Sequence, residues 1–227
     1  MIVVIGSALH RPASGDRPSG AAGLAAGIAT AASAGGSVVQ LVGRVGEDPA
    51  GDATLLALAN AGIGHVATLR DAARATEVEP APVEADPDPR EATDLLSEPT
   101  IGSADDRSSL RAGDVATLDP DDVGLALSYL DDFRVIVVAE PLSRTGLGIA
   151  AEAAAYGGAQ LLVVVAGGGA PEPLPADAIV IEAPESDPDG VFARTVATFA
   201  VALDRGVDPG AALEGAVASA GWERSVG

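Results

Sequence analysis

Short, almost unbroken apolar runs alternate along the chain with segments whose apolar residues fall on one face. The runs at 2–5, 37–42, 133–139 and 160–165 predict strands covered on both faces, as in a parallel sheet, and weaker runs predict strands at 65–69 and 178–181. The segments at 21–34, 48–62, 123–130 and 145–156 predict helices. This alternation predicts an α/β fold with right-handed crossovers, in which ligands collect at the carboxyl ends of the strands.

Glycines and a capping aspartate mark the expected ends of the strand and helix in the second of these units. Gly43 and Gly46 predict a tight turn after the strand, where bulky residues would fit poorly. Asp48 precedes Pro49, which is the pattern of an N-cap followed by proline at the first helical position. Gly62 is expected to end the helix.

The same stretch carries a recognisable signature. Residues 43–51 read Gly-Arg-Val-Gly-Glu-Asp-Pro-Ala-Gly, and residues 58–63 read Leu-Ala-Asn-Ala-Gly-Ile. This resembles the G-R-V-G-x-D-x-x-G and L-x-x-x-G-V motifs of the ribokinase-like, or PfkB, carbohydrate kinases, over residues 1–68 and about 112–221. The resemblance implies a three-layer α/β/α fold with a mostly parallel central sheet. It also implies ATP- and magnesium-dependent phosphoryl transfer to a sugar or nucleoside hydroxyl.

The substrate side of the implied site is altered. The family's glycine pair, which helps to bind substrate, is matched here only at Gly23, and its asparagine falls on Gly27. The sugar-gripping aspartate falls on Arg11. Only a Pro/Gly/Ser-rich loop at 12–19 stands where the family inserts lid strands, so we expect these strands to be absent.

The phosphate side of the implied site is altered further. Asp187 and Gly190 match the start of the family's D-T-x-G-A-G-D motif, which implies a part in binding the nucleotide phosphates. Phe192 and Ala193 stand where the family has its second glycine and its catalytic aspartate. A methyl group accepts no proton, and loss of a general base costs about 10²–10⁴ in rate. Asp189 could substitute as a base only if the loop before the helix took a different path.

Two other acidic residues match family positions. Glu140 follows a strand directly, where ribokinases carry a substrate-contacting glutamate. Glu185 keeps the spacing of the family's N-x-x-E motif, which is tied to magnesium, although Glu182 replaces the asparagine. The family's T-x-G-x-x-G segment over the nucleotide is missing from the sequence. Both glutamates can equally be ordinary loop acids.

Composition limits the size of the domain, the possible partners and the environment of the protein. The 227 residues suffice for a single domain, 1–227, with an acidic, proline-rich excursion at about 70–110. Thirteen basic residues, all arginine, against thirty-three acidic ones give a formal charge of −20, which repels nucleic acid. This excess predicts a salt-loving cytoplasm, where salt screens the self-repulsion, although a GC-rich genome also replaces lysine. No leader or membrane segment is expected.

Three functions remain open from the sequence. The first is a carbohydrate kinase that uses ATP and Mg²⁺. The second is a non-catalytic relative that binds a sugar- or nucleoside-class molecule, or regulates a partner, on the same fold. The third is a metal-assisted enzyme that uses Glu140, Glu185 and Asp187. The weakened motifs favour the second function, while the ligand, the oligomeric state and the role of the acidic segment stay open.

Overall fold

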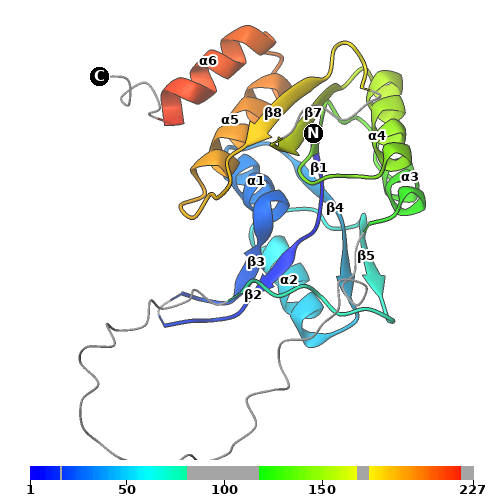
Figure 1. Cartoon of the computed structure of the whole chain (residues 1–227), viewed down its shortest axis with the longest axis vertical. Coiled ribbons are helices and arrows are strands. Elements are labelled where there is room, and N and C mark those ends of the chain that lie inside the picture. Colours follow the sequence, from blue (N-terminus) through cyan, green and yellow to red (C-terminus); the bar gives the residue numbers. More distant parts are fainter. Residues whose placement is uncertain (16, 81–117, 168–173, 221–227) are drawn as a thin grey trace, which may run out of the picture.

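A six-stranded parallel sheet forms the centre of the protein (Figure 1). The structure is a computed structural model that describes residues 1–15, 17–80, 118–167 and 174–220. The strands lie in the order β5-β4-β1-β6-β7-β8. Their bounds are β1 (Ile2–Ile5), β4 (Val39–Gly46), β5 (Thr68–Asp71), β6 (Val135–Val138), β7 (Gln160–Ala166) and β8 (Ile179–Ala183).

The central strand β1 fixes the register of the sheet. Its four residues are fully buried, and Ile2 pairs with Val39 of β4 on one side and Val135 of β6 on the other. All five strand pairings are parallel. The continuous apolar runs in the sequence are explained by this burial on both faces.

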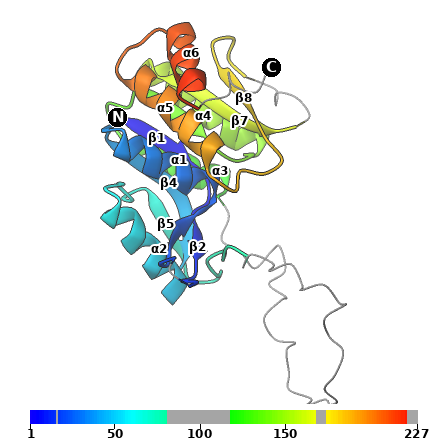
Figure 2. The same cartoon turned by 90° about the vertical axis from the view of Figure 1, so that its left-hand side faces the viewer.

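Two layers of helices cover the sheet. The helices are α1 (Gly23–Ala34), α2 (Pro49–Asn60), α3 (Pro120–Ser128), α4 (Arg144–Gly157), α5 (Val191–Asp204) and α6 (Pro209–Ala220). Helices α1, α5 and α6 share one core cluster, in which Phe199 is the largest fully buried side chain, and α3 and α4 share the other. Figure 2 shows α1 and α5 side by side on the first face. The three-layer α/β/α prediction is therefore confirmed.

The prediction of a turn between Gly43 and Gly46 is wrong. Strand β4 continues through both residues, and Gly43 to Gly46 pair with Thr68 to Asp71 of β5. The glycine at 43 serves close approach instead, because a Cβ there would lie 2.8 Å from the carbonyl oxygen of Gly6. The expected strand at 65–69 is observed as β5, shifted toward its C-terminal end.

The region expected to lack lid strands carries a short hairpin. Strand β2 (Leu9–Arg11) pairs antiparallel with β3 (Gly20–Ala22), and the loop predicted at 12–19 joins them. Because β3 takes up residues 20–22, helix α1 begins at Gly23 rather than at Ala21. Sequence periodicity could not identify strands of three residues. The hairpin forms a separate two-stranded sheet beside the main one (Figure 1).

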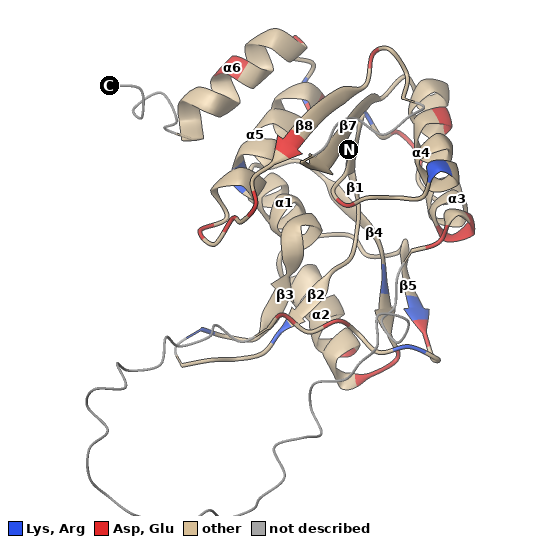
Figure 3. Cartoon of the chain, in the orientation of Figure 1, with Lys and Arg blue, Asp and Glu red and all other residues tan. Residues whose placement is uncertain are grey.

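Acidic residues are scattered over the loops and helix ends of the described chain, while basic residues are sparse (Figure 3). Most of the acidic excursion expected at about 70–110 lies outside the described residues. Among the residues that are described, no helix has the length and apolar character needed to cross a bilayer.

Candidate functional site

The glycine-rich signature around Asp48 is held in place by a network of hydrogen bonds. The Asp48 carboxylate accepts hydrogen bonds from the Gly51 amide at 2.7 Å and from the amide and hydroxyl of Thr76, both at 2.8 Å. The amide of Gly46 in turn donates to the Thr76 hydroxyl oxygen at 2.8 Å. A Cβ at Gly51 would lie only 2.2 Å from the Gly46 carbonyl oxygen, so the spacing of the signature is set by packing.

Because of this hydrogen-bond network, we expect the protein to lose stability in acid. Burial raises the pKa of Asp48, but the hydrogen bonds from Thr76 and Gly51 outweigh it, so the pKa lies below its usual value. The charged form is therefore favoured by folding, and its stabilisation is complete above the unfolded pKa and lost as pH falls through the folded one. We expect Asp48→Asn to cost about 1–2 kcal/mol at pH 7 and progressively less below about pH 4. Urea unfolding between pH 7 and pH 3 measures this, with Glu47→Gln at an exposed neighbouring position as the control. A constant difference across that range would contradict the assignment.

The arginine of the same signature also has a structural position. Arg44 donates to Asp71 at 3.1 Å and to Asp122 at 2.6 Å. These contacts tie β4 to β5 and to the first turn of α3. The arginine side chain is directed into this ion-pair cluster.

The start of α5 is capped by the protein's own carboxylate. The amides of Phe192 and Ala193 donate to Asp187 at 3.0 and 2.9 Å, one to each carboxylate oxygen. The amide of Gly190, whose φ is 62°, donates to the Asp187 carbonyl oxygen. A helix N-terminus attracts an anion through its free amides and its dipole. Here that anion is Asp187.

Ala193 lies in the first turn of α5 and is buried. It is 6% exposed, and a Cβ built on Gly27 of α1 would lie 3.2 Å from its methyl group. The ring of Phe192, at the position of the family's second glycine, is 3% exposed and packs in the core beneath α5. The first turn of α5 therefore closes against α1, and the side chain at 193 has no open space before it.

The other acidic candidates near α5 are exposed and dispersed. Asp189 is exposed, and its backbone carbonyl, rather than its carboxylate, accepts from Arg194 at 2.7 Å. Glu182 and Glu185 are exposed as well. Among the described residues, no three His, Asp or Glu side chains are grouped closely enough to hold a metal ion. The described residues accordingly do not fit a magnesium–nucleotide complex at the start of α5, because its amides are filled and no ligand cluster adjoins it.

Glu140 has the most distinctive environment among the candidates. It directly follows β6 and Ala139, is only partly exposed, and has Ser7 beside its carboxyl group. Burial is the main cause that raises its pKa, with a further contribution from the charge of Glu77, against the lowering by Ser7. A carboxyl group with a raised pKa at the carboxyl edge of a parallel sheet is a candidate ligand-binding group.

The hairpin brings further residues to this edge. Gly23 has φ of 87°, and a Cβ on it would lie 2.6 Å from the Cδ1 atom of Leu9, so Leu9 packs directly over it. His10 exchanges backbone hydrogen bonds with Glu77 and Glu79 at 2.7 and 2.8 Å. These contacts hold the 77–79 segment beside the hairpin.

Sequence reasoning missed Ser7, Leu9 and Glu77. Ser7 follows Gly6 at the end of the first strand, and this position alone could have identified it. Leu9 and Glu77 are brought near Glu140 by the β2–β3 hairpin, and the sequence does not predict this hairpin.

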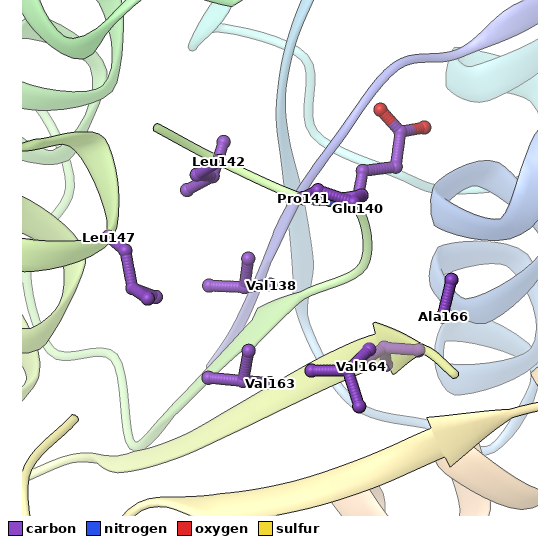
Figure 4. Close-up of a pocket in the computed structure, with 9 residues that line it drawn as sticks. Val138, Glu140, Pro141, Leu142, Leu147, Val163, Val164 and Ala166 are labelled. Carbon is purple, nitrogen blue, oxygen red and sulfur yellow. The ribbon is translucent and has the colours of Figure 1, made fainter. Parts of the chain in front are cut away.

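A pocket lies beside Glu140 (Figure 4). It has a volume of about 150 Å³ and lies under the segment that joins β6 to α4. Its walls come mostly from aliphatic side chains, with Glu140 at the edge.

Comparison with solved structures identifies the architecture. The structure of aminoimidazole riboside kinase from Salmonella enterica aligns over 96% of this chain and 90% of that one, with a TM-score of 0.60 and 14% identity. The chain has the ribokinase-like fold. A putative ribokinase II from E. coli, in its apo form, gives a TM-score of 0.59 at 14% identity over 96% and 91% of the two chains. Arabidopsis thaliana ribokinase complexed with ribose and ATP gives 0.55 at 16% identity over 96% and 90%.

The chain spans about half the length of some solved structures that it matches. Against the Salmonella enzyme complexed with aminoimidazole riboside and an ATP analog, the alignment spans 72% of this chain and 49% of that chain, with a TM-score of 0.47. No protein-family model matches the sequence, and no curated protein sequence matches it either. At 14–16% identity the ribokinase-like neighbours establish the fold and leave the activity to be argued from the site.

Proposed function

We propose that the protein binds a small hydroxylated molecule of the sugar or nucleoside class and does not transfer a phosphoryl group to it. The observation that carries this proposal is the cap of α5, where Asp187 takes the amides of Phe192 and Ala193. A phosphate that bound the same amides would have to displace the Asp187 carboxylate from them. It would then lie close to this like charge, and both effects are unfavourable.

Binding is assigned to the edge of the sheet around Glu140. The Glu140 carboxyl and the Ser7 hydroxyl lie together after neighbouring strands, and both groups exchange hydrogen bonds readily with alcohols. The solved neighbours include an aminoimidazole riboside kinase and a ribokinase complexed with ribose and ATP, which supports the same ligand class for this chain. The metal-assisted alternative has less support, because Glu185 and Asp187 join no metal-binding group among the described residues.

A panel of ribose, ribitol, adenosine and glucose tests the assignment in about 2 M KCl, chosen because of the formal charge of −20. We expect at least one of them to raise the thermal midpoint, since a ligand at 100 times its Kd stabilises by about 2.7 kcal/mol. Glu140→Gln should weaken that binding at least about tenfold, corresponding to one charge-assisted hydrogen bond.

The control is Glu152→Gln, which removes an exposed carboxylate from α4. It should leave the affinity unchanged. The proposal is wrong if none of the four compounds shifts the midpoint, or if Glu140→Gln binds as tightly as the unaltered chain.

A further inference from the structure

The pocket beside Glu140 is built for an apolar group. Val138 ends β6, Val163 lies in β7, and Leu147 lies in the first turn of α4, and each of the three is at most 3% exposed. Leu142 adds a half-buried wall from the segment before α4. Aliphatic walls offer water few hydrogen-bond partners, so an apolar guest is favoured between them.

The size of the pocket limits the guest. Its volume of about 150 Å³ is similar to that of apolar protein cavities that bind benzene. The guest is therefore a single six-membered ring or a branched alkyl group of similar bulk, and not a purine with its ribose.

The pocket and the polar site share one end. Ala166 lines the pocket and is exposed, so the cavity opens at the carboxyl end of β7. Figure 4 shows Leu142 and Leu147 on one side of the pocket and Ala166, with the Glu140 carboxylate, on the other. A molecule that placed its apolar group against the leucines would present its polar part to Glu140.

We infer that the pocket formed by Val138, Leu142, Leu147 and Val163 binds a small apolar ring or branched alkyl group that is carried by the ligand of the Glu140 site. The apolar site stands on its own lining and volume, while its link to a hydroxylated ligand rests on the proposed function. Burying such a group adds stabilisation in proportion to the apolar area removed from water. The ligand class is thus a sugar or similar polyol bearing an apolar substituent.

Two valines on opposite faces of one strand test whether the space is free. Val138→Ile adds a methyl group to the pocket and should raise the thermal midpoint or leave it unchanged. Val137→Ile is the matched control, because Val137 is fully buried in the other core cluster, and the extra methyl group should lower the midpoint by a few degrees. If both variants lose the same amount, the pocket is not free space and the inference is overturned.

Toluene, ribose and benzyl riboside then test the ligand class by calorimetry and by ligand-observed NMR. We expect toluene to bind, and benzyl riboside to bind at least about tenfold more tightly than ribose. Leu142→Phe should fill the pocket, and should therefore abolish toluene binding and the affinity gain of benzyl riboside. Leu56→Phe, at an exposed leucine of α2, is the control and should change neither.

The outcomes separate this inference from the proposed function. Absence of toluene binding, or binding that Leu142→Phe leaves intact, overturns the apolar site even if ribose binds. Toluene binding without any binding of ribose, and without a gain for benzyl riboside, supports the pocket and contradicts the polyol ligand of the proposed function.

Discussion

Replacing Arg44 by methionine is expected to lower the free energy of unfolding by about 3–5 kcal/mol. The arginine side chain is 20% exposed, and its partners Asp71 and Asp122 are 15% and 10% exposed. Methionine would leave Asp122 without the guanidinium at 2.6 Å and Asp71 with only the Arg74 guanidinium, 3.8 Å away, in a place where water solvates both carboxylates poorly. Breaking a buried pair from one side costs far more than the pair contributes when intact.

Equilibrium unfolding in urea measures this loss, and an exposed ion pair supplies the control. Arg70 lies 2.7 Å from Asp52, but the two side chains are 41% and 64% exposed. Arg70→Met should therefore cost no more than about 1 kcal/mol. Equal losses for the two arginine variants would mean that Arg44 does not hold α3 and β5 together.

Replacing Ala193 by aspartate is expected to destabilise the protein by about 2–4 kcal/mol and to create no kinase. The position is buried against Gly27, and its amide already donates to Asp187, so the new carboxylate would meet an apolar helix interface and a like charge. Because burial disfavours the charged form, the loss should shrink as pH falls below about 5.

Denaturant unfolding at pH 7 and pH 4.5 measures both parts of this prediction. Ala211→Asp, at an exposed position in the first turn of α6, is the control and should change stability by less than about 0.5 kcal/mol. A stable Ala193→Asp variant that phosphorylates ribose would show that the first turn of α5 is open to substrate.

Much of the architecture could be predicted from the sequence because burial imposes it locally. A strand covered on both faces must be apolar throughout, so β1, β6 and β7 can be predicted from their almost unbroken apolar sequences alone. The N-cap at Asp48 is likewise a local signal, and the structure confirms it together with the proline that follows.

The errors arose where tertiary contacts decide the conformation. Gly43 serves a close approach between strands, and the same residue type would equally suit a turn. The three-residue strands β2 and β3 are held by each other and by the segment at Glu77, so neither has a period of its own to detect.

The candidate site was only partly accessible from the sequence. Glu140 was identifiable because it follows a strong strand directly. The self-capping of α5 by Asp187 depends on the path of the loop before it, and the apolar pocket depends on how α4 packs over β6 and β7. Neither property belongs to a single stretch of sequence.

Phosphoryl transfer by the unaltered protein is the most direct test of the central claim. The protein is incubated in about 2 M KCl with ATP, Mg²⁺ and each of ribose, ribitol, adenosine and glucose, and products are followed by ³¹P NMR. Because Asp187 fills the start of α5 and Ala193 cannot accept a proton, we predict no phosphorylated product above the rate without protein. Steady formation of a sugar or nucleoside phosphate that depends on the protein would contradict the account.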